Sequence, residues 1–275
     1  MIDNTMSVEQ WKEQKQAERN DAFKAQQSAM EEVLSSGKTL TAYLLGRGRL
    51  GSHITSGNAA VVLKQVPQAR AVLSFEDWSR YGRRVNKGAV GIPQLVRRNG
   101  YYAVEKYFDV SQTYGNKPYP TPTIPPEQIP AAINVLREIS LVPVVLNADP
   151  NLVPGYAPQE DTIFYPSTYP LEEVLRDLPS QIVVSAIQNL IPDHVESEYA
   201  KLIGLAVSVE LCGRFGLEPP RHAEERLGNF RAHIPEGKDR RALEDIREFS
   251  NAMGDSVCRA VSLQRGASEP SKLER

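Results

Sequence analysis

The chain has 275 residues, 41% of them hydrophobic and 24% charged, and its net charge is −2. This composition is ordinary for a soluble globular protein with a real core, and no stretch approaches the ~20 apolar residues that a membrane span needs. The chain has only two cysteines, Cys212 and Cys258, and a chain of this length does not need disulfides for stability, so we expect reduced thiols in the core. Together with the lack of an apolar signal segment at the N-terminus, this favours a cytoplasmic location.

Residues 7–37 predict one long helix. Ser7 and Gln10 form a capping-box pattern, in which each side chain satisfies a backbone N–H group at the helix start. Gly37 suits the end of the helix, because glycine readily adopts the left-handed conformation found there. The apolar stripe between these two ends is thin, so we expect the helix to lie on the surface of its domain.

The stretch GRGRLG, residues 46–51, has the GxGxxG spacing of a dinucleotide-binding loop. That motif needs a strand before it, a helix after it and an acidic residue ~20 positions further on. The preceding run is short, no convincing helix follows at once, and the next acid, Glu76, is too distant. We therefore interpret the stretch as a flexible turn that displays Arg47 and Arg49.

Two short helices are expected next. Residues 57–66 are apolar enough for a buried helix that ends at Pro67. In the following segment, Ser74 is a suitable N-cap for a second helix, with Trp78 on its inner face. Phe75 and Phe108 are interpreted, like Trp78, as core residues.

Residues 91–110 predict a β-hairpin. Two apolar-rich runs flank Asn99 and Gly100, a pair favoured in type I′ turns because both residues tolerate positive φ. With a two-residue loop, Arg98 faces Tyr101 across the strands and Arg97 faces Tyr102.

The segment 115–130 carries six prolines in sixteen residues, which predicts an extended linker and a domain boundary. Beyond it we expect a helix at about 127–141, strands at 142–147 and 161–166, and helices to about residue 264. The predicted fold class is α+β, with an N-terminal α+β domain that contains the hairpin and a mainly helical second domain. The predicted units are residues 1–114, a proline-rich linker at 115–130, a second domain at 131–265 and a disordered tail at 266–275.

Charge is distributed unevenly along the chain. Residues 37–119 contain 13 basic and 4 acidic side chains, whereas the region from residue 120 onward has a net charge of −8. Such asymmetry suggests that one part faces a polyanion, although a solvated basic face is the alternative. Arginine and lysine mixed with aromatic rings is typical of single-stranded nucleic-acid binding, where cations follow the phosphates and rings stack on bases. The candidate DNA-binding residues are Arg47, Arg49, Lys64, Arg80, Tyr81, Arg83, Arg84, Lys87, Arg97, Arg98, Tyr101 and Tyr102.

Signals for catalysis or metal binding are weak. The four histidines are scattered, and no HxxxH, HxH, CxxC or GxSxG pattern occurs. An atypical zinc site built from His194, Glu198 and His222 is the metallopeptidase alternative, since such ligands can bind zinc. The favoured expectation is a chain with no catalytic residue, no metal and no cofactor.

Residues 8–119 resemble antirestriction proteins of the ArdC type, including the LtrC-like proteins of conjugative elements. The pattern F-x-x-W-x-x-x-G-R-x-V-x-K-G-x-x-G-I begins at Phe75 and is followed by FDVSQT at 108–113. The resemblance implies a single-stranded-DNA-binding domain in which RYGRRVNKG, residues 80–88, is the basic turn. The matching positions are Asn58, Gln65, Pro67, Ala69, Phe75, Trp78, Gly82, Arg83, Val85, Lys87, Gly88, Gly91 and Ile92.

Beyond the linker the resemblance is to a zincin-like metallopeptidase domain. Its helix with HExxH corresponds here to 180–194, which lacks that motif, and its glutamate ligand falls near Leu205. The resemblance therefore implies a degenerate, metal-free relative of the peptidase. The expected partner is single-stranded DNA, with duplex bound more weakly, and no membrane. A third possible function, besides DNA binding and an atypical metallopeptidase, is that the acidic second domain binds a host or conjugation protein.

Overall fold

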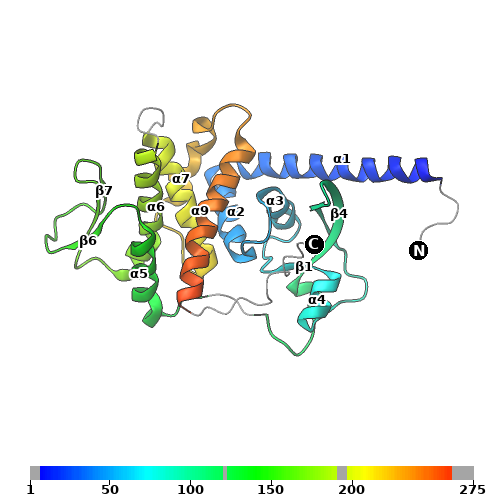
Figure 1. Cartoon of the computed structure of the whole chain (residues 1–275), viewed down its shortest axis with the longest axis horizontal. Helices are drawn as coiled ribbons and strands as arrows, with labels where there is room; N and C mark the ends of the chain where they lie inside the picture. The colour runs from blue at the N-terminus through cyan, green and yellow to red at the C-terminus, as the bar shows by residue number, and fades with distance from the viewer. Residues whose placement is uncertain (1–6, 120–122, 191–196, 262–275) are drawn as a thin grey trace.

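Nine α-helices and three small β-sheets make up the described part of the chain in the computed structural model, which describes residues 7–119, 123–190 and 197–261 (Figure 1). The class is mixed α and β, with helices predominating in the C-terminal half. The N-terminal elements are α1 (Val8–Val33), α2 (Gly37–Leu50), α3 (Ser56–Gln65), β1 (Val72–Ser74), α4 (Phe75–Tyr81), β2 (Arg84–Val85), β3 (Ile92–Arg98), β4 (Tyr101–Asp109) and β5 (Thr113–Tyr114). The C-terminal elements are α5 (Ile129–Ile139), β6 (Val144–Asn147), β7 (Gly155–Ala157), β8 (Thr162–Pro166), α6 (Leu171–Leu190), α7 (Ser197–Phe215), α8 (Ala223–Arg226) and α9 (Asp239–Ala260), with 3-10 turns at 110–112, 126–128 and 227–233.

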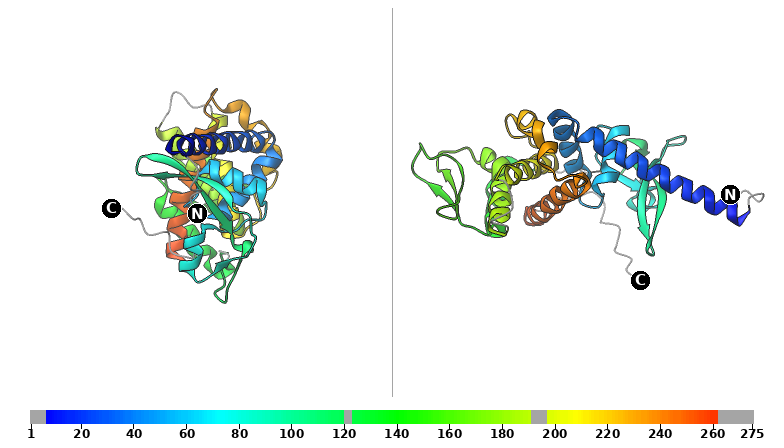
Figure 2. Two further views of the ribbon diagram at one scale, coloured as in Figure 1. Left: turned by 90° about the vertical axis from the view of Figure 1, so that its right-hand side faces the viewer. Right: turned by 90° about the horizontal axis from the view of Figure 1, so that it is seen from above.

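The predicted first helix is two helices. The capping box of Ser7 and Gln10 is confirmed at the start of α1. The predicted end at Gly37 is wrong, because α1 ends at Val33 and Ser36 begins a new helix through its own capping box with Thr39. The first half of α1 projects beyond the rest of the molecule (Figure 2).

Residues 46–50 are helical, so the predicted turn is wrong. α2 runs through it to Leu50 and packs against α7, and the two helices approach closely. A Cβ atom on Gly48 would collide with the backbone of Glu210, and one on Gly213 would collide with the backbone of Leu45. Glycine is needed here because the two helix backbones touch.

The predicted hairpin is confirmed. β3 pairs antiparallel with β4, and Arg98 lies opposite Tyr101, as Arg97 lies opposite Tyr102. Asn99 and Gly100 have φ values of 48° and 86°, the positive angles that a type I′ turn requires. β1 adds to the other edge of β4, giving the order β1-β4-β3.

The C-terminal half is a group of helices with a small sheet at its far end. The sheet has the order β6-β8-β7, and α5, α6, α7 and α9 pack together with α2 between it and the N-terminal sheet (Figures 1 and 2). The expected helix at 127–141 and strands at 142–147 and 161–166 correspond to α5, β6 and β8. The expected disordered tail at 266–275 lies outside the described residues.

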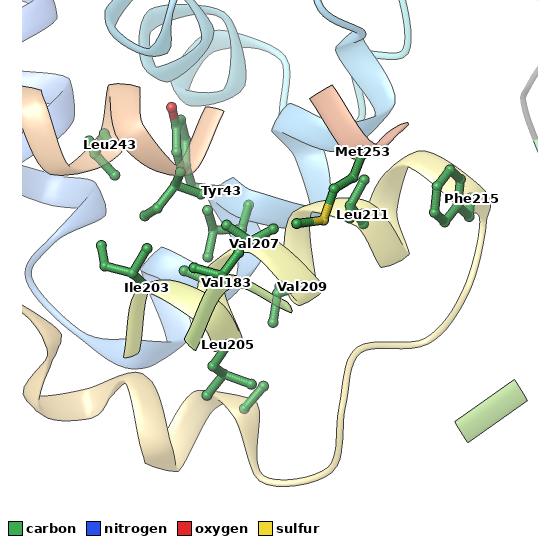
Figure 3. Packing of buried hydrophobic residues seen from close by; sticks show 14 of the residues in the cluster. Tyr43, Val183, Ile203, Leu205, Val207, Val209, Leu211, Phe215, Leu243 and Met253 are labelled. Carbon is green, nitrogen blue, oxygen red and sulfur yellow. The ribbon is translucent and has the colours of Figure 1, made fainter. Parts of the chain in front are cut away.

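One large hydrophobic core contains side chains from both halves of the chain. Tyr43 of α2 packs with Val207 of α7 and Leu243 of α9, as Figure 3 shows. The predicted division at 115–130 stays a prediction. Cys212 and Cys258 are free and buried, as expected, and burial raises the pKa of the Cys212 thiol to about 12. Over the ranges that the structure describes, no helix is long and apolar enough to cross a bilayer.

Candidate nucleic-acid interface

A second, smaller core holds the basic turn in place. It is built around Trp78 of α4, which is fully buried and donates its indole N–H to the Phe108 carbonyl at 2.7 Å. Tyr81 belongs to this core, although we expected it to be free for stacking. Its hydroxyl donates to the Pro118 carbonyl at 2.8 Å, and burial raises its pKa. Trp78 and Tyr81 therefore support the basic turn from beneath.

Arg83 anchors the basic turn to β5 and the segment that follows it. Its Nε donates to Thr113 Oγ1 at 2.8 Å, and its terminal nitrogens donate to the carbonyls of Thr113 at 3.0 Å and Lys117 at 2.7 Å. A guanidinium whose donors are used in this way has few left for a phosphate. Gly82, with φ of 91°, ends α4 in the left-handed conformation and lets the chain turn back into β2.

Arg84 and Lys87 are the two cations of the basic turn that are exposed and that have no ion-pair partner within the described residues, whereas Arg80 is exposed but paired. The structure adds Tyr114, which the sequence reasoning missed. Tyr114 lies directly opposite Arg84 in the β2–β5 pair and is 54% exposed. Strands of two residues leave no pattern in a sequence, so the only available signal was that Tyr114 directly follows FDVSQT in the resemblance.

Two residues of α4, Phe75 and Arg80, match their predicted roles only in part. Phe75, interpreted as a core residue, is 61% exposed at the start of α4, so that prediction is wrong. Arg80 is exposed, as expected, but pairs with Asp77 at 2.9 Å. Such an exposed pair contributes little to stability and partly neutralises the arginine.

The hairpin tip forms the second cluster of cations and rings. Arg97 and Tyr101 are exposed. Tyr102 is half-exposed, and its ring packs edge-on against Phe23 of α1 at a centroid distance of 5.3 Å. Arg98 pairs with Glu105 at 2.8 Å, and this carboxylate raises the pKa of Arg98.

The two clusters lie at opposite ends of β4. The tip carries Tyr101, and the other end of the strand lies at Asp109, next to the small core beneath the turn. At about 3.4 Å per residue, these ends are roughly 27 Å apart. A DNA strand that touched both clusters would therefore have to span roughly 27 Å.

The remaining predicted cations lie away from both clusters. Arg47 is only 1% exposed; it donates to the Gly51 carbonyl at 2.6 Å and lies 3.8 Å from the Glu210 carboxylate. Arg49 donates to the Pro67 carbonyl at 3.1 Å, and burial lowers its pKa. The expectation that a turn displays these two side chains is therefore wrong. Lys64 is exposed but pairs with Glu32 of α1 at 2.6 Å.

The ligands of the alternative zinc site are not brought together in the described residues. Glu198 and His222 are both exposed, and His194 lies in 191–196, outside those residues. Within the described ranges, no three histidine, cysteine or carboxylate side chains gather into a group that could hold a metal.

The sequence matches no protein-family model and no curated protein. Solved structures do match. The Mn(II)-bound crystal structure of the antirestriction ArdC protein from plasmid R388 aligns with a TM-score of 0.53 and 14% identity, over 86% of this chain and 98% of that one. The metal-free crystal structure of the same protein aligns with a TM-score of 0.49 and 16% identity, over 87% and 99%. The resemblance seen in the sequence is confirmed as a likeness of fold: along most of its length, this chain folds like the ArdC antirestriction protein of plasmid R388.

Proposed function

We propose that this chain is a single-stranded-DNA-binding protein of the antirestriction type, belonging to a mobile element and acting without catalysis. The pairing of exposed cations with exposed rings carries the proposal. Arg84 lies opposite Tyr114 in the β2–β5 pair, and Arg97 lies opposite Tyr102 at the hairpin tip. Cations that follow phosphates and rings that stack on bases are how single strands are held without a recognition helix.

Two further observations support this proposal. The region 37–119 carries 13 basic and 4 acidic side chains, so its field attracts a polyanion although the whole chain is slightly acidic. The fold is that of an ArdC antirestriction protein. We expect the strand to run along the N-terminal sheet from the hairpin tip to the basic turn, and duplex to bind more weakly because it cannot offer unstacked bases.

The absence of catalysis rests on the residues at the expected metal site. That ArdC protein has been crystallised with Mn(II), but the corresponding helix here, α6, lacks HExxH. Leu205, near the expected glutamate ligand, is 2% exposed and packs among apolar side chains (Figure 3). A leucine offers no ligand atom, so these residues do not fit a zincin-type metal. Metal analysis of the purified protein tests this directly, and stoichiometric metal would restore the peptidase alternative.

The experiment that tests DNA binding is fluorescence anisotropy with a labelled single strand and a matched duplex at several salt concentrations. We expect tight single-strand binding that weakens steeply with salt, and a large loss in the Arg84→Glu/Lys87→Glu variant. Lys201→Glu/Arg221→Glu is the matched control, because it makes the same charge change at exposed positions of the C-terminal half. Absence of single-strand binding at low salt, or an equal loss in the control, would refute the proposal.

A second candidate function is protein binding by the acidic C-terminal half. The specific observation is a group of exposed apolar side chains around the β6–β8 sheet, including Leu141 at 68% and Val153 at 82% exposure. Exposed apolar groups of this kind mark interaction surfaces. Such a partner would be a host or conjugation protein, and its capture would survive high salt and be lost in a Leu141→Lys/Val153→Lys variant.

A further inference from the structure

A cavity of about 210 Å³ lies beside the N-terminal sheet, between the hairpin and α4. The engineered cavity that binds benzene measures about 150 Å³, so this space suits a single nucleobase better than a whole nucleotide. Gln94, Val96 and Tyr107 contribute to its wall from one face of the sheet, because residues two apart on a strand share a face and Ile92 lies opposite Tyr107. Its polar lining consists of His53, Thr55, Asn58, Asp77, Gln94, Arg97 and Tyr107.

A buried acceptor without a partner lines this cavity. Gln94 is 1% exposed, and its Nε2 donates to the Pro93 carbonyl at 3.0 Å, whereas its Oε1 has no hydrogen-bond partner among the described residues. Buried polar atoms are nearly always satisfied, so this oxygen is suited to a donor that a ligand brings. A donor at this position would complete the hydrogen bonding of the side chain.

Asp77 supplies further acceptors in the same wall. One carboxylate oxygen accepts from Ser74 Oγ at 2.7 Å and the other pairs with Arg80 at 2.9 Å. Each oxygen has two lone pairs, so both retain capacity to accept. The cavity therefore combines an aromatic side chain, Tyr107, with acceptors from an amide and a carboxylate.

The position of the cavity connects it to the candidate interface. Arg97 belongs both to the cavity wall and to the hairpin-tip cluster. Tyr101 and Gln94 lie on the same face of the sheet, while Asp77 comes from α4, whose end leads into the basic turn. A single DNA strand that runs from the hairpin tip to the basic turn would pass the mouth of the cavity.

We propose that this cavity takes one unstacked base of the bound single strand and prefers bases with an exocyclic amino group. The amino group of cytosine, adenine or guanine would donate to Gln94 Oε1 and the Asp77 carboxylate, whereas thymine has no such group. This inference rests on the proposed function, because the cavity reads a base only if the phosphates are held nearby.

The test compares the affinities of dC and dT oligonucleotides of about 15 nucleotides, a length near the upper end of typical single-strand site sizes. Both are pyrimidines, so stacking and backbone contacts are closely matched. We expect the wild type to bind dC up to about tenfold more tightly, the effect of one or two net hydrogen bonds. Gln94→Leu removes the acceptor and Val96→Phe fills the cavity, and each variant should bring the ratio of the dC affinity to the dT affinity close to one.

Val145→Phe in β6 is the matched control for a larger apolar side chain, and it should keep the dC preference. Thermal melting shows whether each variant is folded. Equal affinity of the wild type for dC and dT would overturn the base-binding inference while leaving the proposed function intact, as would a dC preference kept by both folded variants. Failure of the wild type to bind either oligonucleotide would refute the proposed function and the inference together.

Discussion

Two arginine-rich stretches of this chain have opposite environments. GRGRLG, residues 46–51, lies mostly within α2, where Arg47 is buried against Glu210. RYGRRVNKG, residues 80–88, ends a short helix and exposes Arg84 and Lys87. Residue types alone did not distinguish the two stretches. Gly46 and Gly48 of the first allow close contact with other helices, whereas Gly82 and Gly88 of the second have positive φ and bend the chain at the surface.

The largest expected difference between the two stretches concerns stability. Arg47→Ala leaves the Glu210 carboxylate buried without its partner, which costs about 3–5 kcal/mol in the free energy of unfolding. Arg84→Ala is the matched control and should change it by less than about 0.5 kcal/mol. Urea denaturation measures both. Equal effects would mean that Arg47 is not held in the interior.

Arg83 should behave as an intermediate case, because it lies in the basic turn but bonds to the protein. Arg83→Ala removes hydrogen bonds from a charged donor and should cost about 1.5–3 kcal/mol in unfolding free energy. It should also open the segment 113–117 to proteases. Arg80→Ala is the control, because Arg80 is exposed, and it should melt like the wild type. If Arg83→Ala also melts like the wild type and lowers only the affinity for DNA, then Arg83 contacts phosphate.

The exposed cations of the basic turn should affect binding and not stability. Removing two phosphate contacts from a single strand lowers the salt slope by about 1.4, equivalent to roughly 25-fold weaker binding at 0.1 M salt. Arg84→Ala/Lys87→Ala should show this loss in anisotropy titrations with an unchanged melting temperature. A slope equal to that of wild type would place the phosphates elsewhere.

The smallest effect separates two neighbouring arginines at the hairpin tip. Arg97→Ala should lower single-strand affinity by roughly fivefold at 0.1 M salt, the loss of one phosphate contact. Arg98→Ala should have less effect, because Glu105 already neutralises its guanidinium. The same titration measures both variants, and a larger loss for Arg98 would indicate that DNA displaces Glu105.

The sequence was a good guide where local chemistry determines structure. The Asn99-Gly100 turn fixed the hairpin register, and Ser7 and Ser74 both cap helices as expected. The sequence was not a guide where packing between distant parts of the chain determines whether a side chain is buried. The burial of Arg47 depends on α7, which lies some 160 residues away in the chain, and the exposure of Tyr114 depends on pairing between strands of only two residues.

The backbone contact between α2 and α7 at Gly48 and Gly213 has a mechanical consequence. With no side-chain layer between them, the two helices cannot slide or roll past each other without a steric clash. The N-terminal sheet is joined to this crossing through α3, which contacts both β3 and α2. We therefore expect the N-terminal sheet and the helices that lead to the β6–β8 sheet, at the opposite end in Figure 2, to move as one rigid body.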